Sequence, residues 1–233
     1  MDRLPRIAVV TFPGSNDDHD AAWALGALGA DAVAVWHQEP ELPEVGAVVL
    51  PGGFSYGDYL RAGAIARFSP VMQAVTEFAT GGGLVLGICN GFQVLCEVGL
   101  LPGVLRPNVS LRFVCRDVTL RVERVDTPFT ARCEPGQRLT IPVKHGEGCY
   151  FCPPELLQQL GWQGFVVLRY EDGQNPNGSA GDVAGLINAA GNVMGLMPHP
   201  EHAVDPLLGS GDGALILGSL VDAARERLAA AAA

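Results

Sequence analysis

The sequence predicts an α/β protein built on an open, mixed and mostly parallel β-sheet with helices on both faces. Short runs rich in valine, isoleucine and leucine alternate with longer helix-like stretches, which is typical of a parallel sheet covered on both sides. Hydrophobic residues make up 48% of the 233 residues and charged residues 17%, so the chain can bury a substantial core. We find no internal repeat and no linker, and we expect one domain over residues 1–233.

The first half of the chain contains four apolar runs of strand length. The run at 7–12 is stopped by Pro13 and Gly14, and its unbroken apolar character predicts a strand that is buried on both faces. Helix-like stretches lie between the first and second runs, between the third and fourth, and after the fourth. The predicted strands are 7–12, 32–36, 46–50 and 84–88, and the predicted helices are 19–29, part of 62–80, and 90–97.

Beyond Leu101 polar and apolar residues begin to alternate, and this pattern favours antiparallel additions to the sheet. Two apolar runs flank residues 189–192, which predicts a β-hairpin. The predicted strands in this part are 111–125, 139–144, 165–170, 183–187 and 193–197, and the last predicted helix is 213–229.

Charge and cysteine content narrow the class of function. The net charge is −10 and the 15 lysines and arginines form no basic run, which argues against nucleic acid as a partner. We see no signal peptide and no stretch that could span a bilayer, so we expect a cytoplasmic chain with free thiols. Cys149 and Cys152 have the spacing of a metal or redox pair, but no second pair and no local histidine accompany them. We therefore interpret them as packing residues and predict no metal. The glycosylation sequons at Asn108 and Asn177 are interpreted as chance matches.

The segment Gly87-Ile88-Cys89-Asn90-Gly91 lies between a predicted strand and a predicted helix. A nucleophile on such a tight turn is the elbow of α/β acyl-transfer enzymes, and glycines on both sides let the backbone turn and pack closely. The dipole of the following helix favours a thiolate at this position. We predict that Cys89 is a catalytic nucleophile. The alternative is a buried structural cysteine, which is the role that we expect for Cys96.

His199-Pro200-Glu201 follows the last predicted strand. Pro200 disfavours helix at His199, so we expect an extended stretch in which residues two apart project to the same side. Glu201 could then orient one ring nitrogen of His199 while the other faces Cys89. A solvated histidine at a strand end is the competing interpretation. The position favours catalysis, because active sites of α/β sheets gather where strands end.

A glycine-rich segment, 51–58, also follows a predicted strand. Acyl transfer needs two N–H groups aimed at the developing oxyanion. A glycine-rich loop can bring its backbone close enough to donate one of them, and the amide of Asn90 can donate the second. Such a segment would otherwise be an ordinary turn, so its significance depends on its sharing a sheet edge with Cys89 and His199.

Together these segments resemble the class I, or triad-type, glutamine amidotransferases. That family has an open, mixed α/β fold of the flavodoxin-like kind and releases ammonia from glutamine with a Cys-His-Glu triad. The resemblance implies the following roles: Cys89 as nucleophile, His199 as base, Glu201 as its orienter, Gly53 and Asn90 as oxyanion-hole amides, and Gln93, His145 and Gly146 as glutamine contacts.

Further segments are similar to one branch of the family, glutaminase subunits that serve a separate synthetase. These matches run from Phe12 to Asp212, with a departure at His202, where the branch usually has arginine. The resemblance implies that ammonia passes to a large synthetase subunit, joined by a small bridging subunit, for ATP-dependent conversion of formylglycinamide ribonucleotide to formylglycinamidine ribonucleotide in purine synthesis. ATP and magnesium would belong to the partner, and this chain would carry no cofactor. The matching segments are 51–61, 89–93, 108–113, 144–148, 175–179 and 197–201.

Other functions remain open on the sequence alone. A triad amidotransferase could feed a different synthase, although the matches at 51–61 and 108–113 argue against it. A cysteine hydrolase or stress protein of the related elbow fold could work alone and would be indifferent to glutamine analogues. A regulatory subunit without activity would require a defect in the triad, and the sequence shows none.

Overall fold

The computed structural model describes residues 4–171 and 173–231. Within these residues a 9-stranded sheet has the order β2-β1-β3-β4-β11-β10-β9-β6-β7. Strands from β2 to β11 pair in parallel and strands from β11 to β7 pair antiparallel, so the predicted mixed sheet is confirmed. The strands are β1 (Arg6–Thr11), β2 (Asp31–Trp36), β3 (Ala47–Leu50), β4 (Leu84–Ile88), β6 (Val114–Val122), β7 (Arg138–His145), β9 (Val166–Tyr170), β10 (Val183–Ile187) and β11 (Val193–Leu196), and a separate pair joins β5 (Val104–Arg106) to β8 (Cys149–Phe151).

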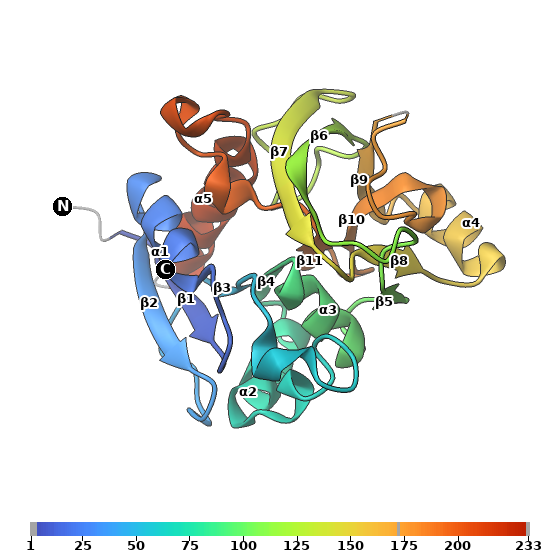
Figure 1. Ribbon diagram of the computed structural model, residues 1–233. Coiled ribbons are helices and arrows are strands. Elements are labelled where there is room, and N and C mark those ends of the chain that lie inside the picture. The colour runs from blue at the N-terminus through green and yellow to red at the C-terminus, as the bar shows by residue number, and fades with distance from the viewer. Residues whose placement is uncertain (1–3, 172, 232–233) are drawn as a thin grey trace.

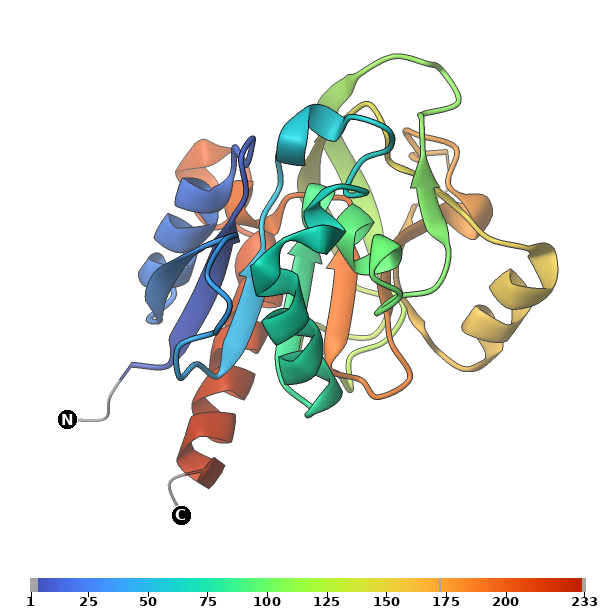
Figure 2. The same cartoon turned by 90° about the horizontal axis from the view of Figure 1, so that it is seen from below.

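Helices cover both faces of the parallel part of the sheet, as predicted. On one face α1 (Asp18–Ala27) and α5 (Gly213–Ala231) pack together and against β1 (Figure 1). On the other face α2 (Pro70–Thr80) and α3 (Asn90–Glu97) pack against β4, as Figure 2 also shows. A fifth helix, α4 (Pro154–Trp162), lies at the antiparallel end (Figure 1). In the part of the chain that the structure describes, we find no helix with the length and apolar character to cross a membrane.

The centre of the sheet forms the core of the protein. Every residue of β3, β4, β10 and β11 is buried, because these strands have neighbours on both edges and covered faces. The parallel strands β3, β4 and β11 end at the same edge of the sheet, at Leu50, Ile88 and Leu196. The three predicted catalytic segments follow these three strand ends, so the fold brings them together.

Several predicted boundaries need correction. Only Pro70–Thr80 of the segment 62–80 is an α-helix, because Pro70 favours an extended Ser69 and begins the helix. Strand β6 begins at Val114 rather than at residue 111, since Leu111 has a positive φ of 53° that strands do not accommodate. The hairpin around 189–192 is confirmed, with β10 and β11 antiparallel. Helix α4 was not predicted.

Candidate active site

Cys89 occupies a strained turn between β4 and α3. Its backbone has φ 50° and ψ −103°, which is a rare conformation for a residue with a side chain and is typical of functional sites. The Cys89 amide donates to the carbonyl oxygen of Leu196 over 2.8 Å, which fixes the turn against β11. A Cβ atom on Gly91 would lie 2.0 Å from the Leu50 carbonyl oxygen. The glycine therefore lets α3 approach β3 closely enough to form the predicted elbow.

His199 lies beyond the end of β11, and both His199 and Glu201 are buried. The nitrogen Nδ1 of His199 is 2.6 Å from Oε1 of Glu201. The other nitrogen, Nε2, has no hydrogen-bond partner among the described protein atoms, although the Cys89 sulfur is close enough to affect the pKa of His199. The structure therefore places His199 between the Glu201 carboxylate and the Cys89 sulfur. The roles of nucleophile, base and orienter stay predictions.

Electrostatic interactions in this group favour the charged imidazolium. Burial lowers the pKa of His199, but the negative charge of Glu201, the charge of a Cys89 thiolate and the hydrogen bond with Glu201 raise it to about 10. At neutral pH the arrangement therefore holds a proton on His199, which lies between the Glu201 carboxylate and the Cys89 sulfur. An imidazolium beside the sulfur is the arrangement that favours a thiolate nucleophile.

The local backbone at His199 differs from the predicted extended stretch. His199 itself is not helical, with φ −105° and ψ 86°, but residues Pro200–His202 form a short 3-10 turn. Proline suits the first position of such a turn, because its fixed φ is already helical and its missing N–H is not needed there. Glu201 still reaches His199, so the prediction of an extended stretch was wrong while the predicted contact was right.

Asn90 joins the glycine-rich loop to α3. Its side-chain oxygen accepts from the Ser55 amide at 3.2 Å, and its side-chain nitrogen donates to Asp58 at 3.3 Å and to Gln93 at 2.9 Å. Gly53 has φ 145°, and a Cβ atom there would lie 2.7 Å from Asn16 N. Only glycine fits this backbone, so it lets the loop that carries the predicted oxyanion donor pack closely against the turn after β1.

Gln93 reaches the loop after β7. Its amide nitrogen donates to the carbonyl oxygen of Glu147 over 2.6 Å, so the predicted glutamine contacts Gln93 and Gly146 lie in segments that touch each other. The side chain of His145, in contrast, bonds Asn108 at 3.1 Å and Asn177 at 3.3 Å. Its role as a glutamine contact stays a prediction, and its visible contacts support the loop.

The Asn108 and Asn177 network was missed as a functional feature. Burial and the charge of His199 lower the pKa of His145 to about 4, so His145 is neutral at pH 7 and can donate to Asn108 from Nδ1 while accepting from Asn177 at Nε2. Both asparagines are fully buried, which agrees with the view that their sequons are chance matches. The motifs at 108–113 and 175–179 were the available signal.

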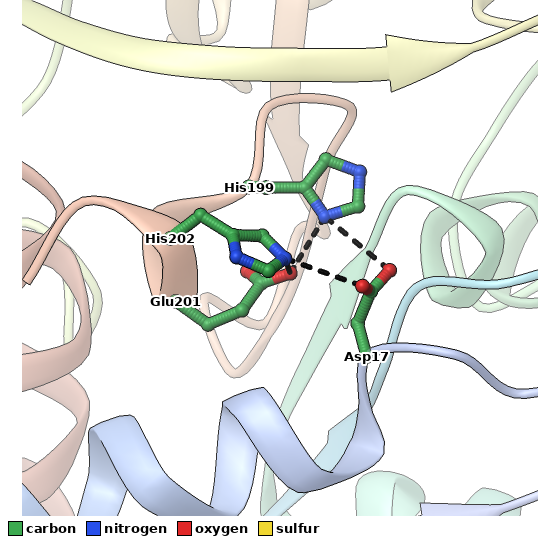
Figure 3. A group of neighbouring side chains, drawn as sticks. All are labelled: Asp17, His199, Glu201 and His202. Atoms are coloured by element: carbon green, nitrogen blue, oxygen red, sulfur yellow. Dashed lines mark hydrogen bonds and ion pairs between the residues drawn. The ribbon is translucent and has the colours of Figure 1, made fainter. Parts of the chain in front are cut away.

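Asp17, Lys144 and His202 were also missed. They surround the outer side of His199 and Glu201, and Figure 3 shows Asp17 reaching from the start of α1 toward both histidines. Asp17 follows the turn after β1, at the sheet edge where sites gather, and this was the signal in the sequence. Lys144 forms an ion pair with Asp17.

Asp17, His199, Glu201 and His202 are also close enough to hold a metal ion, with ligand atoms within 4.8 Å of one another. A metal would have to displace the Lys144 ammonium from Asp17 and the proton shared by His199 and Glu201. These side chains already pair with one another and with Lys144, so the geometry favours a proton network over a metal centre.

Replacing Asp58 by asparagine is expected to stabilise the protein at pH 7.5. Burial and the charge of Glu147 raise the pKa of Asp58 from 3.8 to about 6, against the hydrogen bond from Asn90. When the pKa of a carboxyl group is higher in the folded state than in the unfolded chain, the folded protein loses stability as pH rises through that range. Asparagine should therefore add about 1–2 kcal/mol above pH 6, a figure reduced for solvent screening of this partly exposed group. The φ of 53° also suits asparagine.

Thermal melting of Asp58→Asn at pH 7.5 and at pH 5 tests this expectation. The gain should be larger at pH 7.5, because the carboxyl group is mostly protonated at pH 5. An equal gain at both pH values would assign the effect to the backbone alone, and a loss of stability at pH 7.5 would contradict the expectation.

Comparison with known proteins adds independent findings. Residues 4–210 match the family described as the CobB/CobQ-like glutamine amidotransferase domain. The "Phosphoribosylformylglycinamidine synthase subunit PurQ" of Rubrobacter xylanophilus is 59% identical over 94% of this chain and 99% of that protein. The protein of the same description from Salinibacter ruber is 56% identical over 93% of this chain and 96% of that protein.

Solved structures agree with the fold. A chain of the "Structure of PurLQS from Thermotoga maritima" superposes with a TM-score of 0.87 at 44% identity and covers 94% of this chain and 99% of that chain. A second structure, of a glutamine amidotransferase from Thermotoga maritima, has a TM-score of 0.57 at 17% identity and covers 97% of both chains. The second likeness shows the fold alone.

Proposed function

Because the chain belongs to the CobB/CobQ-like glutamine amidotransferase family, we propose that it is the glutaminase subunit of phosphoribosylformylglycinamidine synthase. It hydrolyses glutamine to glutamate and ammonia and delivers the ammonia for synthesis of formylglycinamidine ribonucleotide. The observation that carries the proposal is the buried His199–Glu201 pair at 2.6 Å beside the strained elbow of Cys89. This geometry is the one that thiol-based acyl transfer needs.

The reaction begins with attack of the Cys89 thiolate on the side-chain amide carbon of glutamine. The C–N bond breaks as the His199 imidazolium protonates the leaving nitrogen, which releases ammonia and leaves a γ-glutamyl thioester. Neutral His199 then takes a proton from water, and the hydroxide attacks the thioester carbon. The C–S bond breaks, glutamate leaves, and the sulfur and His199 return to their starting state.

The surrounding residues stabilise charge and hold the substrate. The Gly53 and Asn90 amides donate to the oxyanion of both tetrahedral intermediates, and each such donor is worth roughly 10²–10³ in rate. Gln93 and Gly146 contact the amino-acid end of glutamine, with the Gln93 bond to Glu147 setting the position of the loop. The His145 side chain holds this loop in place through its hydrogen bond with Asn108.

The partners follow from similarity to the PurLQS assembly of Thermotoga maritima. A large synthetase subunit uses the ammonia, ATP and magnesium to aminate formylglycinamide ribonucleotide, and a small subunit bridges the two. The glutaminase chain binds no cofactor of its own. We place it in the cytoplasm, which is supported by six free cysteines in the described residues.

A glutamine-mimicking diazoketone tests the proposal. We expect it to alkylate Cys89 in the complex with the synthetase, and mass mapping of the adduct identifies the residue. Cys96 is the internal control, because burial raises its pKa well above the usual range and leaves it unreactive. Absence of label on Cys89, with or without the partner, would overturn the proposed function. Labelling without glutamine-dependent product from this synthetase would point to a different synthase.

A further inference from the structure

Asp17 is buried next to the base but has no part in the triad. It lies at the residue before α1, where its amide donates to the Gly52 carbonyl oxygen over 3.2 Å. A Cβ atom on Gly52 would lie 2.4 Å from Oδ2 of Asp17 and 2.6 Å from Cε1 of His199. Gly52 therefore packs closely against both the Asp17 carboxylate and the imidazole ring, and position 52 has no room for a larger residue.

The carboxylate of Asp17 has a different partner at each oxygen. Oδ2 lies 3.6 Å from Nδ1 of His199, on the side that Glu201 also faces. Oδ1 forms the ion pair with the Lys144 ammonium and lies 3.2 Å from Nε2 of His202. Burial would raise the pKa of Asp17, but the His202 hydrogen bond and the charges of His199 and Lys144 lower it to about 2. Asp17 is therefore negatively charged at neutral pH.

Lys144 connects this carboxylate to the nucleophile. Its side chain pairs with Asp17, and its main-chain oxygen lies 3.9 Å from the Cys89 sulfur. The base is thus surrounded by groups from several elements. The titratable or charged groups that face His199 are Glu201 and His202 on its own turn, Asp17 before α1, Cys89 before α3, and Lys144 and His145 on β7.

We propose that Asp17 is a positioning residue: it is a second carboxylate that stabilises the imidazolium form of His199 during glutamine hydrolysis. The Lys144 ammonium partly neutralises the charge of Asp17 and so weakens this stabilisation. The inference rests on the proposed function. Removing Asp17 takes negative charge away from His199, whereas removing the Lys144 ammonium leaves the Asp17 charge uncompensated. The two substitutions therefore change the proton affinity of His199 in opposite directions.

The test compares kcat/KM for glutamine at pH 10 and at pH 8 in the assembled complex. In Asp17→Asn we expect the proton on His199 to be lost about one pH unit earlier, so that the ratio of the two values falls about five-fold. In Lys144→Met the loss moves about one unit later, and the ratio rises nearly two-fold. Titration of glutamine itself affects all variants alike and cancels in the comparison.

Asp18→Asn is the matched control, because it removes the same charge one residue away, where the Asp18 carboxylate contacts Thr11 at 3.3 Å and is half-buried. Its ratio should equal that of the unchanged protein. A merely structural role of Asp17 would lower activity at both pH values without moving the ratio, and this result, or shifts of the same sign in both variants, would overturn the inference. If Asp17→Asn does not fold, the sign of the shift in Lys144→Met decides. If the protein without substitutions shows no glutaminase activity, the proposed function itself is rejected.

Discussion

Replacing Cys89 by alanine is expected to lower glutamine hydrolysis by roughly 10⁴-fold or more, because no other group can form the thioester. The loss should appear in kcat, while glutamine binding persists, since Gln93 and the loop at Glu147 remain in contact. Release of ammonia from glutamine by the assembled complex measures the effect. Residual activity above the uncatalysed rate would come from the remaining oxyanion donors.

Two controls make this result specific. Cys96→Ala removes a buried thiol from the same helix, and it should leave the glutaminase rate within a few-fold of the unchanged protein. Ammonium salts supplied directly should restore product formation in the Cys89→Ala complex, because the synthetase needs only ammonia. Failure of ammonium to restore the product would indicate that the substitution disrupts the complex. Full activity of Cys89→Ala with glutamine would contradict the role of the thiol.

The central fold could be predicted because its strands are buried on both faces. Such strands appear as unbroken apolar runs, as in 46–50 and 84–88, and neither a polar residue nor a turn interrupts them. That Cys89 and His199 lie close together could be predicted for a related reason. Cys89 and His199 each follow a strand of the same parallel sheet, and the ends of such strands meet at one edge.

The second layer around His199 could not be predicted from local patterns. Asp17 and Lys144 are separated by 127 positions in the chain, and they follow or lie on β1 and β7, two strands that are not neighbours in the sheet. The place of Asp17 after a strand and of Lys144 in the segment 144–148 marks each position, but neither signal indicates that the two side chains meet. The close approach of Asp17 to His199 depends on Gly52, whose packing becomes visible only in three dimensions.

Other misses have local causes. Helix α4 begins at Pro154, directly after Pro153. Two successive prolines look like a loop, although proline suits the first turn of a helix. Pro200 likewise begins the short turn Pro200–His202, where we expected an extended stretch. The family resemblance implied that His145 contacts the substrate. Its ring is buried, and its two ring nitrogens bond to two asparagine side chains. A motif thus located the loop correctly without defining what each of its side chains does.

Replacing Glu201 by glutamine is expected to lower kcat by roughly 10³–10⁴-fold while KM for glutamine changes little. The Glu201 carboxylate accepts a hydrogen bond from the Nδ1–H group of His199 over 2.6 Å. Glutamine of the same shape can turn its NH₂ group toward that nitrogen, which moves the proton to Nε2 and directs an N–H group at Cys89. The base is then in the wrong tautomer for attack, although the site keeps its volume.

The substitution should also change the pH dependence. The charge of Glu201 helps hold the pKa of His199 at about 10, so its removal lowers that pKa and moves the basic limb of kcat/KM to lower pH. Single-turnover measurements from pH 7 to pH 10 would record both effects. A rate within ten-fold of the unchanged protein would contradict the role of Glu201 as orienter.

The residual activity of Glu201→Gln carries a further consequence. The Asp17 carboxylate still lies 3.6 Å from Nδ1 of His199 and can stabilise some imidazolium in place of Glu201. Adding Asp17→Asn to Glu201→Gln should therefore remove more activity than Asp17→Asn removes from the unchanged protein. If the two effects simply multiply, the carboxylates act independently; if the second loss is larger, they share one proton on His199.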